Sequence, residues 1–232
     1  MRFSTDTPQG FTILELIIAL FLGGLVTTAG YAFYTSQYQT KIEQERVAVM
    51  QQNLRSAMVL LSKDIRRAGY DPQEATAAGI TLAKQDQFSL SYSIEGEDNG
   101  LDDDGDNAID EKDEAQLVNA ISYVLEDGNS DGTTDLLRKI GTGSYVIAAE
   151  NIDGLEFRYK LKSSSTSSTT KYDDILAVEV ALLIKSPRKD RGFKNTKEYK
   201  GFFKTWGPYN DEFKRRLLKG TIQCRNLNLQ GG

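Results

Sequence analysis

The stretch Gly10-Phe11-Thr12-Ile13-Leu14-Glu15 opens an apolar run, FTILELIIALFLGGLVTTAGYAFY, that extends from Phe11 to Tyr34. Tyrosine apart, Glu15 is the only ionisable residue in this run. A bilayer core takes about 20 predominantly apolar residues as one helix, so the run predicts a membrane-spanning helix. A carboxylate inside such a helix costs about 2.5–3.5 kcal/mol on insertion scales, and it therefore implies a function and a partner.

Two less specific interpretations of the same stretch stay open at this point. A secretory signal would carry its cleavage site after the apolar run, but Thr27-Thr28-Ala29-Gly30 is a weak match and the helical pattern continues through it. Alternatively, Glu15 could lie at the membrane interface near the start of the helix. A free α-amino group at Phe11 would be a natural partner for Glu15, because its reference pKa of about 7.7–8.0 makes it cationic.

The stretch from Gly10 to Glu15, followed by an apolar helix, resembles the prepilin motif shared by type IV pilins and type II secretion pseudopilins. The resemblance implies that a prepilin peptidase removes residues 1–10 as a leader, cutting between Gly10 and Phe11, and then methylates Phe11. It also implies that Glu15 neutralises the N-terminus of a neighbouring subunit during assembly. The leader departs from the family pattern, because it ends in Gln9 and contains Asp6, so that its basic character rests on Arg2.

Helical periodicity continues past the apolar run through residues 35–70. Apolar residues recur at spacings of three and four, which predicts one buried face of an amphipathic helix: Val47, Met50, Leu54, Met58, Leu61 and Ile65. We expect one helix from about Thr12 to Ala68, ended by Gly69 and Asp71-Pro72. The sequence of residues 52–70 resembles minor pilins of the PilW type and the related J-type minor pseudopilins.

Residues 71–232 change to a period of two, which predicts strands with one buried face. The expected strands cover residues 88–94, 120–125, 136–140, 145–149, 155–161, 178–184 and 201–206, and a last strand contains Cys224. Ser163–Thr170 has turn composition and should join two antiparallel strands. The predicted fold class is therefore α+β, with a long N-terminal helix packed on an antiparallel sheet. The resemblance makes this fold type IV pilin-like.

An acidic segment from residue 95 to 114 holds eleven acidic residues and one basic residue. Because the whole chain has a net charge of −5, this segment of −10 leaves +5 on the remainder. Its carboxylates keep the spacing of a calcium loop, with oxygens at positions 1, 3, 5, 9 and 12: Asp102, Asp104, Asp106, Asp110 and Asp113. A second, incomplete series comprises Asp127, Asn129, Asp131 and Asp135, and its twelfth position is Arg138. The sequence predicts one Ca²⁺ at the first series and, less strongly, another at the second; the plainer interpretation of both is a solvated acidic loop.

Composition excludes several kinds of chemistry. The chain has no histidine and one cysteine, which removes Ser-His-Asp and Cys-His catalysis, thiolate zinc sites and internal disulfides. The acidic segment offers no apolar pocket that would set two carboxyl pKa values apart, so we expect no enzyme. Lys185–Lys219 holds twelve bases interleaved with aromatic residues, as in single-strand nucleic-acid grooves, although a solvated surface is the stronger interpretation. Cys224 should be a buried apolar residue.

The functional prediction is a minor type IV pilin that is incorporated in a type IV pilus or primes its assembly. The expected partners are the prepilin peptidase, other minor and major pilins, and the pilus assembly machinery. The expected location is the bacterial inner membrane, crossed once, with residues 71–232 as a periplasmic head, and then the pilus. Two alternatives remain, a J-type pseudopilin of a type II secretion system and a membrane-anchored calcium-binding protein that never enters a fibre.

Overall fold

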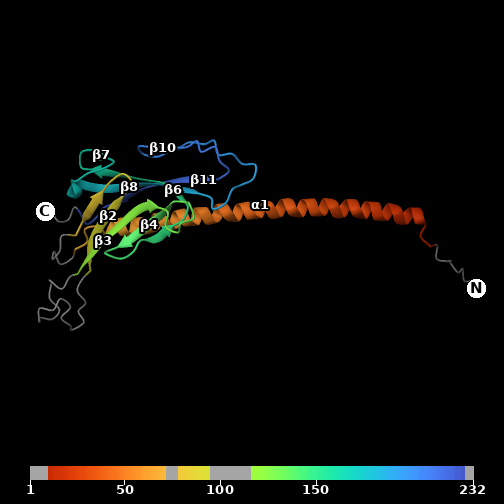
Figure 1. Ribbon diagram of the computed structural model, residues 1–232, viewed down its shortest axis with the longest axis horizontal. Helices are drawn as coiled ribbons and strands as arrows, with labels where there is room; N and C mark the ends of the chain where they lie inside the picture. The colour runs from red at the N-terminus through yellow and green to blue at the C-terminus, as the bar shows by residue number, and fades with distance from the viewer. Residues whose placement is uncertain (1–9, 72–77, 95–115, 228–232) are drawn as a thin grey trace, which may run out of the picture. The chain divides into compact units, whose positions relative to one another are not determined.

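The computed structural model describes residues 10–71, 78–94 and 116–227 (Figure 1). One helix, α1, extends from Ile13 to Arg67, and eleven strands follow it in the described parts of the chain. The chain divides into two compact units, Met1–Val47 and Ala48–Gly232. We call the second unit the head and describe each unit by itself.

The described strands of the head are all antiparallel to their neighbours. The first sheet has the order β1-β2-β3-β4-β5, and its strands are Ile80–Ala83, Phe88–Ile94, Gln116–Glu126, Asp135–Ile140 and Val146–Ala149. The second has the order β11-β8-β6-β7, with strands Arg215–Gln223, Ile175–Lys185, Ile152–Leu161 and Ser165–Thr166. Between β8 and β11 lies a small hairpin of β9, Tyr199–Lys200, and β10, Thr205–Trp206. The predicted α+β class is confirmed, with two main sheets in place of the one expected.

The core of the head joins these sheets to the second half of α1. The predicted stripe of α1 is confirmed at Met50, Leu54, Leu61 and Ile65, which are all buried. Phe88 of β2 and Phe157 of β6 pack with ring centroids 5.4 Å apart and so connect the two main sheets. Burying side chains of this size contributes about 1.5–3 kcal/mol each.

Most strand predictions are confirmed in position, and the exceptions have physical reasons. Residues 201–206 do not form one strand, because the chain turns between β9 and β10 and only Thr205–Trp206 is extended. The short strand β1 was not predicted, because four residues give too few repeats to establish a period. Ser163–Thr170 does join the antiparallel strands β6 and β8, and it also contributes β7. Cys224 lies just past the end of β11 and is buried, as predicted.

Candidate functional site

The N-terminal unit presents the start of α1, which begins directly after Thr12. The Thr12 hydroxyl accepts a hydrogen bond from the backbone N–H of Glu15 at 3.3 Å, so Thr12 is the N-cap residue. Thr12 and Glu15 have the spacing of a capping box, and Glu15 is the acidic residue of the first turn. Nothing lies within 4 Å of a Cβ atom placed on Gly10, and Phe11 is 87% exposed. The predicted processing residues therefore stand together at an accessible helix start.

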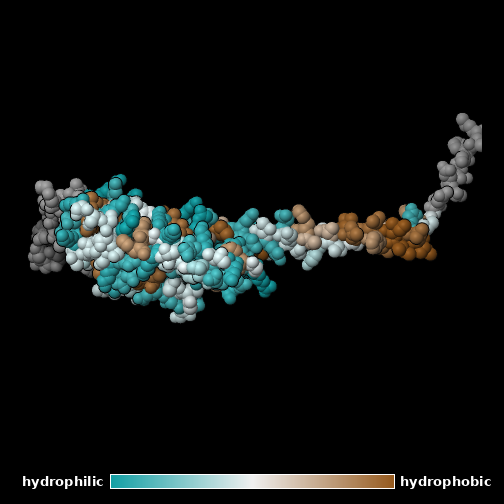
Figure 2. Space-filling view, turned by 90° about the horizontal axis from the view of Figure 1, so that it is seen from above, coloured by the Kyte–Doolittle hydropathy of each residue, from teal (hydrophilic) through white to brown (hydrophobic). Residues whose placement is uncertain are grey.

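The apolar run forms the surface of this helix, as the brown stretch in Figure 2 shows. In the part of the chain that the structure describes, none of the residues in the most apolar section of this run is buried. The hydroxyls of Thr27 and Thr28 each donate a hydrogen bond to a backbone carbonyl four residues earlier, at Gly23 and Gly24, both at 2.8 Å. These bonds satisfy both hydroxyl donors inside the helix, which suits an apolar solvent.

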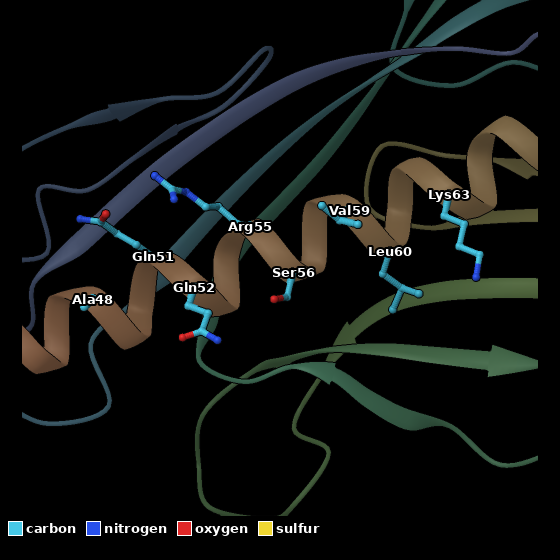
Figure 3. A pocket seen from close by; sticks show the side chains of 8 residues that line it. All are labelled: Ala48, Gln51, Gln52, Arg55, Ser56, Val59, Leu60 and Lys63. Carbon is cyan, nitrogen blue, oxygen red and sulfur yellow. The ribbon is translucent and has the colours of Figure 1, made fainter.

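In the head, one face of α1 is exposed to solvent. Eight residues of α1 line an open groove, shown in Figure 3: Ala48, Gln51, Gln52, Arg55, Ser56, Val59, Leu60 and Lys63. Val59 is 67% exposed, although the opposite face of the same turns is buried in the core. The second half of α1 therefore has one face packed on its own sheets and one face open.

Two family models match the chain, each over one part. The model of the prokaryotic N-terminal methylation motif matches residues 8–31, which include Gly10, Phe11 and Glu15. The model of type IV pilus-assembly protein W, PilW, matches residues 141–226, from the turn after β4 to just past the end of β11. These two matches indicate a minor type IV pilin.

Among solved structures, a type IV-like pilin from Thermus thermophilus is similar to this minor pilin, with a TM-score of 0.48 and 14% sequence identity. The similarity covers 76% of this chain and 97% of that one. No curated protein matches the sequence. The methylation motif implies processing by a prepilin peptidase and assembly with other pilins, and the apolar helix is consistent with membrane anchoring. The two pilin-family matches point to a structural protein.

The first calcium series, Asp102–Asp113, lies outside the described residues. Of the second series, the structure brings Asp127, Asn129 and Asp131 into one tight loop. The carboxylate of Asp127 accepts hydrogen bonds from the backbone N–H groups of Asp131 and Gly132, at 3.3 and 2.9 Å. Asp131 accepts bonds from the Thr133 hydroxyl and backbone, which hold the pKa of its carboxyl below the usual value.

Asp135, the last member of this series, does not gather with the side chains of Asp127 and Asp131 among the described residues. It is buried, and its carboxylate accepts hydrogen bonds from the backbone N–H groups of Asn151 at 2.9 Å and Gly128 at 3.3 Å. Among the residues that the structure describes, no three carboxylate or thiol side chains gather as a metal site would require. The described part of the second series is held by hydrogen bonds within the protein.

A buried charge fixes α1 to the first sheet, and the sequence patterns did not reveal it. Asp64 lies among the apolar residues of the α1 stripe, and its side chain is only 3% exposed. Its Oδ2 atom accepts a hydrogen bond from the Tyr123 hydroxyl at 2.6 Å and one from Arg138 Nε at 2.7 Å. Burial and the neighbouring Asp64 carboxylate raise the pKa of Tyr123 well above its usual value. The helix periodicity alone assigns Asp64 to the buried face, so an acid on that face was the available signal.

A second buried carboxylate organises the β9–β10 turn. Glu156 of β6 is fully buried and accepts hydrogen bonds from three successive backbone N–H groups, at 2.5 Å from Phe202, 3.3 Å from Phe203 and 2.7 Å from Lys204. Gly201 begins this turn, and a Cβ atom there would lie 2.2 Å from Glu156 Oε2. The glycine is therefore required by the close approach of the carboxylate.

The basic and aromatic segment Lys185–Lys219 differs from a nucleic-acid groove. Five of its seven aromatic rings are faced by cations of the same chain: Lys185 over Phe213, Lys197 over Tyr199, Lys214 over Phe193, Lys219 and Arg158 over Phe202, and Arg215 over Tyr209. Rings engaged in this way are not open platforms for bases. The geometry favours a solvated surface, the stronger of the two sequence interpretations.

Arg215 anchors the base of this segment. Its side chain is 3% exposed and forms ion pairs with Asp153 and Asp211, both at 2.6 Å. The hydrogen bond from Arg215 holds the pKa of Asp211 below its usual value, against a smaller opposing effect of burial. The pair with Asp153 therefore ties the start of β11 to the start of β6, and the pair with Asp211 closes the segment just before β11.

Proposed function

We propose that this minor pilin is inserted in the bacterial inner membrane by residues 11–34, with the head in the periplasm. The prepilin peptidase then cuts between Gly10 and Phe11 and methylates the new terminus, and the subunit enters a type IV pilus or primes its assembly. The observation that carries this proposal is the exposed apolar surface of α1 between Ile13 and Tyr34. The chain itself leaves that surface uncovered, so lipid must cover it before assembly and other subunits afterwards.

Glu15 supplies the charge that this assembly requires. Cleavage would leave an ammonium group on Phe11, next to the positive end of the α1 dipole, where a cation is disfavoured. A carboxylate from Glu15 of an adjacent subunit can neutralise that ammonium in lipid, where an unpaired charge is costly. The N-cap at Thr12 holds Glu15 in the first turn and so keeps it at the same depth as the terminus.

Glu15→Ala tests the proposal in cells that assemble the pilus. We expect the variant to be cleaved and methylated normally but to be absent from sheared pili, because the terminal ammonium has lost its partner. Glu45→Ala is the matched control, since Glu45 is an exposed acid of the same helix with only a long ion pair to Lys41 at 3.9 Å. Normal recovery of the Glu15→Ala subunit in pili would refute the assembly role and favour a membrane anchor that never enters a fibre.

The match to the PilW model supports a pilus over a type II secretion pseudopilus. Deleting the gene separates these two assignments. If the protein is a pilin, the deletion should remove surface pili and leave protein secretion unchanged. If it is a J-type pseudopilin, the deletion should abolish secretion.

We further propose that Asp102–Asp113 binds one Ca²⁺, as supported by five carboxylates at calcium-loop spacing in the sequence. Calorimetry on the full chain in detergent should show calcium heat that Asp104→Asn with Asp106→Asn removes. Asp127→Asn with Asp131→Asn is the matched pair, and it should leave the heat unchanged if the first series is the site. The absence of any calcium heat would refute the proposal.

A further inference from the structure

The segment between β8 and β11 carries an exposed basic turn. Four cations of this turn, Arg188, Lys189, Arg191 and Lys194, are exposed and form no ion pair within the described parts of the chain. The one acid among them, Asp190, is engaged by Lys214 at 2.5 Å. We call these four cations the basic turn. Their charge is therefore available to a partner.

The basic turn is held in place by its backbone. Hydrogen bonds from Asp190 N to Glu212 O at 2.8 Å and from Asn195 N to Asp211 O at 2.7 Å tie the turn to the segment that precedes β11. The buried side chain of Asn195 donates a further bond to Phe213 O at 2.9 Å. The four charges are presented on a turn with fixed backbone contacts, which lowers the entropic cost of binding a surface.

The basic turn lies at the end of the head where α1 enters. The C-terminal end of β11 lies at the far end of the helix, because Asn226 donates a hydrogen bond to Arg66 O at 2.9 Å and Gly220 faces Met58. The start of β11, at Arg215, therefore lies toward the Ala48 end of the helix. The basic turn continues in that direction beyond the ends of β8 and β11 (Figure 1).

We propose that the basic turn binds anionic phospholipid headgroups of the membrane into which residues 11–34 insert, so that the head rests on the bilayer before assembly. The proposal rests on that membrane insertion. Only thirteen residues separate Tyr34 from Ala48, so even in a fully extended chain these two residues would lie at most about 50 Å apart. This tether holds the head at high effective concentration near the lipid surface.

The chemistry of the turn favours headgroups over the lipid interior. Its aromatic residue, Phe193, is partly buried and has Lys214 Nζ 5.7 Å from its ring centroid, so no exposed aromatic side chain is offered for insertion. Each Lys or Arg near an anionic surface is worth about 1 kcal/mol, which is about a fivefold change in the ratio of bound to free heads. Binding should therefore be electrostatic and sensitive to salt.

The test uses the full chain reconstituted in lipid vesicles, with a donor fluorophore on Thr196→Cys and an acceptor on the headgroups. The native Cys224 does not compete for the label, because it is buried and burial raises its pKa to about 12. We expect energy transfer to be higher with 30% phosphatidylglycerol than with phosphatidylcholine alone, and to fall to the phosphatidylcholine value in 0.5 M NaCl. These compositions are chosen to separate lipid charge from lipid proximity.

Replacing Arg188, Lys189, Arg191 and Lys194 by Gln should remove the dependence on phosphatidylglycerol, whereas a single replacement should lower the bound ratio about fivefold. A matched variant neutralises four exposed cations at the opposite end of the head: Lys84, Lys162, Lys171 and Arg225. This variant should behave as the native chain.

Equal energy transfer of the native chain with both lipids would overturn the proposal and would indicate that the basic turn binds an acidic protein partner instead. Flotation with neutral vesicles in high salt measures membrane insertion of residues 11–34 by itself. A chain that does not float under these conditions fails in insertion and not in headgroup binding.

Discussion

Removing the buried carboxylate of Asp64 should strongly destabilise the head. Its Oδ2 atom holds both the Tyr123 hydroxyl and Arg138 Nε at hydrogen-bond distance. Asp64→Ala leaves an uncompensated guanidinium, and breaking a buried pair in this way costs about 3–5 kcal/mol. Because the Arg138 side chain is 16% exposed and can recover some hydration, we expect a loss near 3 kcal/mol.

Urea denaturation of the full chain in detergent measures this loss, and Trp206, the only tryptophan, reports on the head. Tyr123→Phe should cost about 1–2 kcal/mol, because Asp64 keeps its ion pair with Arg138. The two changes should not be additive, since both remove the same hydrogen bond. Lys63→Ala, at the preceding exposed position of α1, should stay within about 0.5 kcal/mol of the native chain. A loss under 1 kcal/mol for Asp64→Ala would refute the reasoning.

Three further predictions concern the head. Gly201→Ala should lower the free energy of unfolding by about 1–3 kcal/mol in the same urea assay, because the new Cβ would meet Glu156 Oε2 at 2.2 Å. Asp211→Asn should destabilise the head at neutral pH, and the difference from the native chain should shrink as the pH falls below about 4. Arg215 lowers the folded pKa of Asp211, so its stabilisation is complete above the unfolded pKa and is lost as the pH falls through the folded one. Cys224 should resist maleimide at pH 7.5 and react in urea, because burial raises its pKa to about 12.

Each of these predictions has a control and a contradicting outcome. Gly79→Ala, where the nearest atom lies at 3.8 Å, should be tolerated, and equal losses at both glycines would exclude the steric explanation. A destabilisation by Asp211→Asn that stays constant down to pH 2 would show that the charge is not its cause. Rapid labelling of Cys224 in the native chain would mean that the end of β11 opens in solution.

Features that depend only on neighbouring residues, such as the helix and the longer strands, could be predicted from the sequence. Glu15 in an apolar run predicts a membrane helix with a special carboxylate, and the stripe from Met50 to Ile65 predicts the buried face of α1, because helical period and hydropathy are properties of neighbouring residues. The longer strands are likewise confirmed where a period of two repeats several times. For the acids at Asp127 and Asp131 the sequence predicted either a second calcium site or a solvated acidic loop, and it did not show that backbone N–H groups of the same loop bond to these carboxylates.

Only the tertiary structure decided which distant groups meet. Asp64 and Arg138 are 74 residues apart, and no local pattern pairs an acid on a helix with a base on a strand. In the sequence, Arg138 stands out only as the twelfth residue of the second acidic series, where its side chain cannot bind calcium. The basic and aromatic segment was ambiguous for the same reason, because sequence spacing does not say whether a ring faces solvent or a cation of its own chain. Burial forces charged groups to find partners across the fold, and those partners are fixed by packing rather than by order along the chain.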